Sequence, residues 1–187
     1  MAVTTLDAKT ALIVIDLQNG IVALPTAHPT ADVIVHASAL ASAFRSHNLP
    51  VVLVNVAGGA PGRAEQSRNL AGLPDGWTDL VPPLNRQPGD LAVTKHTWGA
   101  FTNTGLAEQL EDLEVTQVVI AGVATSAGVE STARQAHELG FNVTLAIDAM
   151  TDTSAEAHAN SIARIFPRLG ETGSTQDIID LIGRTHA

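Results

Sequence analysis

Two charged residues stand at the ends of apolar runs, where a carboxylate and an ammonium group could act together. Asp16 follows the apolar residues 11–15, and Lys95 follows residues 91–94. A carboxylate is costly to bury in such a place unless it is paired or functional. Two other readings stay open: Asp16 could cap a turn, and Lys95 could be a solvated strand end. Together, the two residues suggest an ion pair beside a pocket.

A glycine-rich turn, GVATSAGVESTARQA at residues 122–136, follows another apolar run. Turns of this kind often carry a nucleophile or bind an anion. Here only Thr125, Ser126 and the bare Gly128 lie near the expected helix start. Ser126 is not in a GxSxG motif, and both hydroxyl residues are favoured as helix N-caps. The best-placed residue of the turn, Gly128, therefore has no side chain.

The sequence predicts no metal and no cofactor. Its seven histidines contain no His-x₃-His pair, which a helical zinc site would need. GGAPG at residues 58–62 lacks the Lys-Ser/Thr end of a P-loop, and GVATSAG does not fit GxGxxG. His96 is the one histidine beside the expected site, and we expect it to support the site or to lie on the surface.

The elements that must position these residues follow an alternating pattern. Continuous apolar runs predict strands buried on both faces, as in a parallel sheet, with amphipathic helices between them. Possible capping boxes begin the last two helices, at Thr153 and Ser174, and Gly140 ends an earlier one. The expected strands are 11–16, 50–56, 90–94, 116–123, 141–147 and a short one near 168–173; the expected helices are 30–47, 104–113, 126–139, 154–166 and 175–183.

Residues 57–89 interrupt this pattern with a Gly- and Pro-rich stretch that has no sustained period. A connection this long is usually functional, or it contains a short helix. Its flanks belong to one alternating pattern, so it does not read as a linker. We therefore expect residues 1–187 to form one α/β domain.

Composition narrows the class of protein. The net charge of −9 and the absence of a basic cluster argue against a nucleic-acid partner. The chain has no cysteine, which excludes disulfides and a cysteine nucleophile. No window approaches the ~20 apolar residues of a membrane helix, and Asp16 interrupts the only apolar run near the N-terminus. These features predict a cytoplasmic protein with no membrane partner.

Three blocks, residues 16–19, 94–101 and 122–133, resemble the isochorismatase-like hydrolase superfamily. They occur in that family's order, and the resemblance covers roughly residues 8–183. It implies a Rossmann-like three-layer α/β/α fold with a six-stranded parallel sheet. It also implies self-association as a homodimer or homotetramer.

The resemblance implies roles for individual residues. Many members use an Asp–Lys–Cys triad, whose positions here are Asp16, Lys95 and Gly128. The family's non-proline cis peptide would join Val123 and Ala124 and aim backbone N–H groups at an oxyanion. The metal that nicotinamidases bind near the second strand lacks its histidine in residues 55–58. Expected substrate contacts are Gln18, Trp98, Phe101, Val123, Ala124 and Thr125, with Leu24 and the 57–89 segment adding specificity.

With glycine at position 128 the covalent mechanism is lost, because no thiolate is available. The isochorismatases proper also carry glycine there and cleave a vinyl ether, which needs a proton and a water. Asp16 would be the general acid, and Lys95 would orient it or bind a substrate carboxylate. A nearby ammonium lowers a carboxyl pKa whereas a general acid needs a raised one, so burial must dominate, or Lys95 must face the substrate.

We therefore expect a cofactor-free hydrolase that acts on a small substrate, which could carry a carboxylate, with cleavage of a vinyl ether preferred. Isochorismatases commonly have Tyr-Ala-His where this chain has Ala124, Thr125 and Ser126, so the particular substrate is open. Two alternatives remain. One is a hydrolase of amides or imines that uses water activated by Asp16. The other is a catalytically silent homologue that binds a metabolite or a protein.

Overall fold

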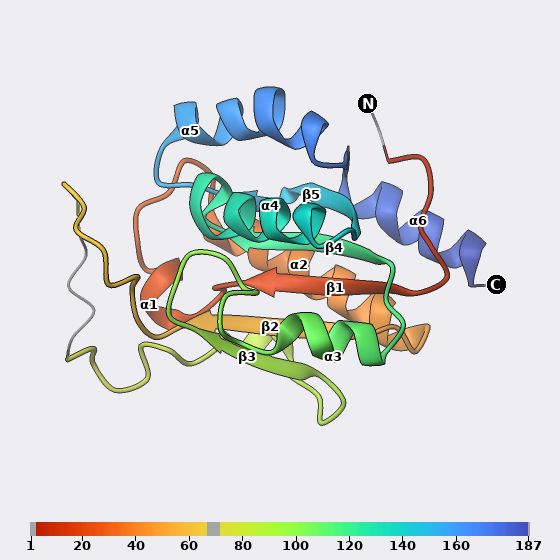
Figure 1. Cartoon of the computed structure of the whole chain (residues 1–187), viewed down its shortest axis with the longest axis horizontal. Helices are drawn as coiled ribbons and strands as arrows, with labels where there is room; N and C mark the ends of the chain where they lie inside the picture. The colour runs from red at the N-terminus through yellow and green to blue at the C-terminus, as the bar shows by residue number, and fades with distance from the viewer. Residues whose placement is uncertain (1–2, 67–71, 187) are drawn as a thin grey trace.

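A six-stranded, all-parallel sheet forms the centre of the molecule, in the strand order β3-β2-β1-β4-β5-β6 (Figure 1). The computed structural model describes residues 3–66 and 72–186. The chain adds strands to one side of β1 and then returns to add the others beside it, so the order reverses between β1 and β4. The strands are β1 (Thr10–Ile15), β2 (Val51–Val56), β3 (Leu91–Lys95), β4 (Gln117–Val123), β5 (Asn142–Thr151) and β6 (Glu171–Gly173).

Helices cover both faces of the sheet, which confirms the predicted three-layer α/β/α fold. Along β1, Leu12 and Val14 belong to one apolar cluster and Ile13 and Ile15 to the other, because successive side chains of a strand point to opposite faces. The first cluster contains α2 (Thr30–Ser46) and α6 (Thr175–Thr185); the second contains α3 (Leu106–Asp112), α4 (Glu130–Glu138) and the segment after α5 (Ala155–Asn160).

The predicted end of the fifth strand is wrong. β5 continues past residue 147 to Thr151, because its register with β4 shifts and then resumes where Gly122 pairs with Met150. Asp148 therefore lies within the strand, and its carboxylate accepts hydrogen bonds from the backbone and hydroxyl of Thr175. The carboxylate at the end of β5 is Asp152.

The predicted helix 154–166 is regular only in its first part. After α5 ends, the chain forms a π turn, η3 (Ser161–Ile165), and a 3₁₀ turn, η4 (Phe166–Arg168). Pro167 cannot donate a helical hydrogen bond. The N-cap is Ser154 rather than the predicted Thr153, because the Ser154 hydroxyl accepts from the Ala157 N–H at 3.2 Å.

Two other predicted helix signals are confirmed. Ser174 and Asp177 form a reciprocal capping box at the start of α6. Gly140 follows α4 with a left-handed φ of 91°, which glycine adopts without strain.

The 57–89 segment packs against the carboxyl ends of β1 and β2 through its residues 76–81. It contains the 3₁₀ turn η1 (Pro82–Leu84), and residue Leu80 forms a bridge with Gln18. The Trp77 ring lies against Gly20, where a Cβ atom would be only 2.0 Å from the indole. Gly20 belongs to α1 (Asn19–Val22), a single turn that the sequence pattern did not predict. Residues 67–71 of this segment lie outside the described residues.

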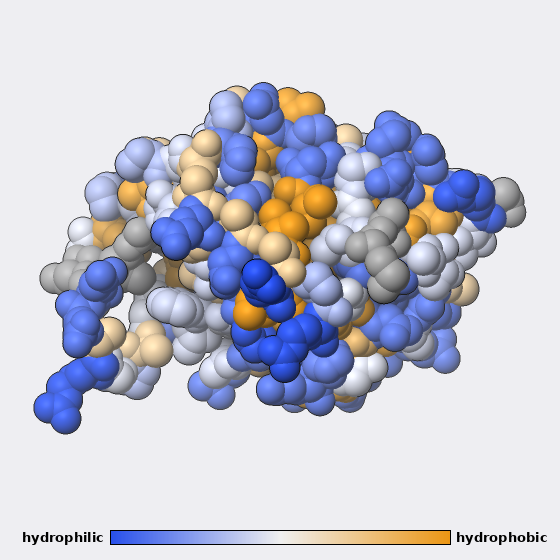
Figure 2. Space-filling model, turned by 90° about the horizontal axis from the view of Figure 1, so that it is seen from above, coloured by the Kyte–Doolittle hydropathy of each residue, from blue (hydrophilic) through white to orange (hydrophobic). Residues whose placement is uncertain are grey.

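The face seen in Figure 2 is mostly hydrophilic, with apolar side chains gathered near its middle. Within residues 3–66 and 72–186, no helix is long and apolar enough to cross a membrane.

Candidate active site

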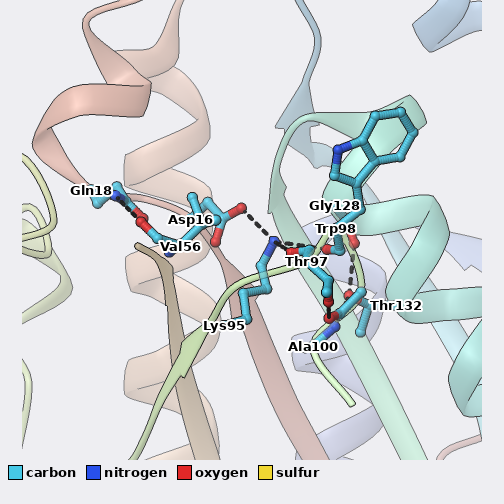
Figure 3. A network of polar contacts seen from close by, with 10 residues as sticks. Asp16, Gln18, Val56, Lys95, Thr97, Trp98, Ala100, Gly128 and Thr132 are labelled. Atoms are coloured by element: carbon cyan, nitrogen blue, oxygen red, sulfur yellow. Dashed lines mark hydrogen bonds and ion pairs between the residues drawn. The ribbon is translucent and has the colours of Figure 1, made fainter. Parts of the chain in front are cut away.

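Asp16 and Lys95 form a buried ion pair at the carboxyl end of the sheet (Figure 3). Their Oδ2 and Nζ atoms lie 2.8 Å apart, and the side chains are only 7% and 2% exposed. The two strand ends are not neighbours, because β2 lies between β1 and β3. The four-carbon stem of the lysine spans this gap. The alternative of a solvated strand end for Lys95 is therefore wrong.

The backbone turns sharply at Asp16 to present its carboxyl group. Asp16 has a left-handed φ of 51°, a conformation that aspartate tolerates better than most residues. Its N–H donates to the Val54 carbonyl at 2.9 Å, which keeps it in register with β2. The side chain does not cap the following turn; its partner among the described residues is Lys95.

Gln18 secures the turn from the other side. Its Oε1 atom accepts from the Val56 N–H at 2.7 Å, and its Nε2 atom donates to the Val56 carbonyl at 3.0 Å and to the Trp77 carbonyl at 3.4 Å. The side chain is fully buried. Both ends of the Gln18 amide are thus bound by backbone, whereas the sequence-based expectation was a substrate contact.

Lys95 is held by more than the carboxylate. Its Nζ atom donates to the Trp98 carbonyl at 2.7 Å and to the Thr97 carbonyl at 3.2 Å. With Asp16, these acceptors match the three donors of an ammonium group. The ammonium is therefore fully hydrogen-bonded and fixed in place.

Burial raises the pKa of Asp16 from 3.8 to about 6, and the ammonium of Lys95 opposes this shift without cancelling it. Of the two opposing effects on the pKa of Asp16, burial is therefore the larger. The Oδ1 atom is buried and has no hydrogen-bond partner among the described residues. The raised pKa keeps a larger share of the carboxyl groups protonated near neutral pH, as a general acid requires.

Gly128 faces this ion pair. A Cβ atom built on Gly128 would lie 3.3 Å from Asp16 Oδ2 and 3.4 Å from Lys95 Nζ, and 2.9 Å from a methyl group of Ile15. The three residues that the sequence selected as catalytic candidates, Asp16, Lys95 and Gly128, therefore lie together.

The turn that carries Gly128 begins at a cis peptide bond between Val123 and Ala124, as the resemblance implies. The turn itself is a π helix, η2 (Thr125–Val129), whose N-cap residue Ala124 makes no side-chain cap. The expected capping by Thr125 or Ser126 is wrong. The Thr125 hydroxyl instead contacts His158 Nδ1 at 2.8 Å.

Asp152 holds this turn, and sequence reasoning missed it. Its Oδ2 atom accepts from the N–H and the hydroxyl of Ser126 at 2.7 and 2.8 Å, and its Oδ1 atom accepts from the Ser154 N–H at 3.1 Å. The signal that could have identified it was the correct end of β5.

The other expected substrate contacts lie in different settings. Trp98 is 67% exposed and its indole points away from the ion pair (Figure 3). Phe101 is half-buried and stacks on Phe141, with ring centroids 6.0 Å apart. Val123 is in the core, and Ala124 is partly exposed. His96 is exposed and lies against Gly58, as a surface histidine would.

An all-parallel sheet, an ion pair at the strand ends and a π-helical turn after β4 are thus the main features of this site. The sequence matches the Isochorismatase domain over residues 10–177, and the chain belongs to this family.

Relatives cover nearly the whole chain. The uncharacterized isochorismatase family protein YecD of Escherichia coli O157:H7 is 40% identical, over 95% of this chain and 98% of its own. The structure of an isochorismatase family protein from Burkholderia thailandensis superposes with a TM-score of 0.92 at 39% identity, covering 96% and 98% of the two chains. The ureidoacrylate amidohydrolase RutB of Pseudomonas savastanoi is 29% identical over 74% of this chain and 69% of its own.

Proposed function

We propose that the protein hydrolyses the vinyl ether of a small carboxylated substrate, with Asp16 as general acid and without a cofactor or a protein nucleophile. The carrying observation is the Asp16 carboxyl group, which has a pKa of about 6 and one oxygen, Oδ1, that no described residue binds. Because Lys95 holds Oδ2, the free Oδ1 is the oxygen that carries the proton. Gly128 lies beside Oδ2 of the same carboxyl group, and its lack of a side chain avoids close contacts with Ile15 and the ion pair.

The reaction has two stages, which are hydration of the vinyl ether and breakdown of the resulting hemiketal. The Oδ1–H bond of Asp16 breaks as its proton forms a C–H bond at the terminal vinyl carbon, and the positive charge is shared by the adjacent carbon and the ether oxygen. A water oxygen adds to that carbon and returns one proton to Asp16. The hemiketal hydroxyl then loses its proton as the C–O bond to the former ether oxygen breaks, and that oxygen gains a proton, which gives a ketone and an alcohol with one water consumed.

Lys95 has an orienting role in this mechanism. Its ammonium group is fully hydrogen-bonded by Asp16 and two carbonyls. By holding Oδ2, it fixes the rotamer of Asp16 and leaves Oδ1 without a hydrogen-bond partner among the described residues. After proton transfer it also stabilises the carboxylate that forms, because the attraction of opposite charges is stronger in a buried site than in water.

Position 128 corresponds, by the family resemblance, to the nucleophilic cysteine of the amidase branch. Gly128 supplies no sulfur, and the chain has no other cysteine. We therefore propose that the protein is not a competent cysteine amidase.

Amide or imine hydrolysis is the second candidate, and the likeness to a ureidoacrylate amidohydrolase favours it. In this reaction the ionised Asp16 would take a proton from the attacking water. The two candidates thus require opposite protonation states of the same carboxyl group.

The direct test supplies purified protein with isochorismate and follows pyruvate release, with Asp16→Asn in parallel. Asparagine keeps the size of the side chain but has no transferable proton. Turnover by the parent and none by the variant is expected. Absence of parent turnover would reject this substrate and leave the amide panel and a catalytically silent protein as the remaining readings.

We also propose that the protein acts in the cytoplasm as a homodimer or homotetramer. Within the described part of the chain, four large apolar side chains are exposed and could be covered by a subunit contact: Val35, Trp98, Leu113 and Leu139.

A further inference from the structure

A buried threonine on α4 connects the two loops of the candidate active site. Thr132 is fully buried, and its hydroxyl donates to the Gly128 carbonyl at 2.7 Å. The same oxygen accepts from the Ala100 N–H at 3.1 Å (Figure 3). We propose that Thr132 is a positioning residue, whose single hydroxyl group fixes the turn that carries Gly128 against the loop that holds Lys95. This proposal builds on the proposed function of the same site.

The loop in question supplies the two carbonyl groups that bind Lys95. Thr97 and Trp98 accept from the ammonium, and Ala100 follows two residues later. Because Ala100 is anchored to Thr132, the carbonyls of residues 97 and 98 are held at a set distance from α4. The position of the ammonium, and through it the rotamer of Asp16, depends on that anchor.

A second contact from the same helix face supports this role. Gln135, one turn after Thr132, accepts from the Phe101 N–H at 3.1 Å and donates to the Thr102 hydroxyl at 2.6 Å. The approach is close, since a Cβ atom on Gly99 would be 2.2 Å from the Gln135 side-chain oxygen. Residues 99–102 are thus bound to α4 along their length.

Thr132 differs from Gln135 because it also reaches the Gly128 turn. A hydroxyl has one donor and two acceptor sites, so it can serve a carbonyl on one side and an N–H on the other. The Thr132 hydroxyl therefore links the backbone of Gly128 to the backbone of Ala100. Loss of the hydroxyl would remove the Thr132 partner of the Ala100 N–H and one donor to the Gly128 carbonyl.

The test combines three variants with a chemical measurement that needs no substrate. Thr132→Val removes the hydroxyl at nearly constant shape, and Thr132→Ser retains it. Thr144→Val is the matched control, because Thr144 is an equally buried threonine that accepts one hydrogen bond, from Gln117 in the neighbouring strand.

Lysine labelling reports on the loop directly. Lys9 and Lys95 are the only lysines of the chain, and their side chains are 56% and 2% exposed. Acetic anhydride labelling, read by mass spectrometry, gives the rate at Lys95 relative to Lys9. We expect Thr132→Val to raise this ratio roughly fivefold or more through local opening. Thr132→Ser and Thr144→Val should stay at the parent ratio.

Activity gives the second readout. If the parent cleaves isochorismate, we expect kcat of Thr132→Val to fall roughly tenfold at a temperature where it is fully folded, with Thr132→Ser restoring it. A labelling ratio and a kcat that stay at the parent level in folded Thr132→Val would overturn the proposal, and so would an equal rise in the ratio for Thr144→Val. An inactive parent would reject the proposed function alone, because the labelling ratio still decides the role of Thr132.

Discussion

The buried carboxyl group of Asp16 combines three properties that an exposed carboxyl group lacks. Burial raises its pKa to about 6, one of its oxygens is fixed by Lys95, and the other has no described partner. The sequence predicted the pairing from residue types at strand ends. It could not predict that burial outweighs the ammonium, because that balance depends on how much solvent reaches the carboxyl group.

Gly128 is the residue whose lack of a side chain can be tested most simply. Gly128→Ala places a methyl group against Ile15 and within 3.4 Å of both members of the ion pair. We expect kcat for vinyl-ether cleavage to fall roughly tenfold or more, because the turn or the ion pair must shift to admit the methyl group.

A matched glycine provides the control for that substitution. Gly183 lies in α6, and a Cβ there would meet no atom within 4 Å. Gly183→Ala should leave kcat unchanged and raise the free energy of unfolding by about 1 kcal/mol. A kcat of Gly128→Ala equal to that of the parent would contradict the proposal that the site needs a residue without a side chain at position 128.

At the scale of elements, the periodicity of the sequence predicts the central strands and helices. The predictions are wrong where tertiary contacts change the start or end of an element. β5 is longer than its apolar run because β4 continues to pair with it through Thr151. The turn at Thr125 and Ser126 is not capped by its own hydroxyls, because Asp152 and His158 bind them. Both partners are distant in sequence, so no local pattern indicates them.

The junction of β1, β2 and the 57–89 segment depends on Gln18. Gln18→Glu replaces the Nε2 donor by an oxygen that faces the Val56 and Trp77 carbonyls. We expect the free energy of unfolding at pH 8 to fall by about 2 kcal/mol or more, because buried acceptors then oppose each other. Chemical denaturation measures this.

Gln109→Glu serves as the control for the Gln18 substitution. Its amide makes an exposed bond to the Gly105 carbonyl, so the same change should alter stability by no more than about 0.5 kcal/mol. Equal effects of the two substitutions would show that Gln18 does not secure the junction.

At the scale of the whole molecule, the sheet brings together residues that are far apart in the chain. Asp16, Lys95 and Gly128 come from the ends of β1, β3 and β4, which share one edge of the sheet. Parallel sheets bind ligands at the carboxyl ends of their strands, and this rule predicted that the site lies at the carboxyl end of the sheet. The order of the strands, and the gap that Lys95 spans across β2, could not be read from the sequence pattern alone.

Self-association is the prediction that concerns the whole molecule. We expect light scattering on a sizing column to give two or four times the 19.4 kDa of one chain. A concentration-independent mass of one chain would contradict it. Burial of the exposed Trp98 in a subunit contact would appear as a shift of tryptophan emission on dilution.

The pH dependence of kcat/KM for isochorismate cleavage, followed by product NMR from pH 5 to 8, tests the acid role of Asp16 most directly. The proton donor must be protonated, and the pKa of Asp16 is about 6. The proposed mechanism predicts a plateau at the acid end and a loss of roughly a hundredfold by pH 8. A kcat/KM that is flat, or that rises with pH through 6 as a carboxylate base requires, would contradict it.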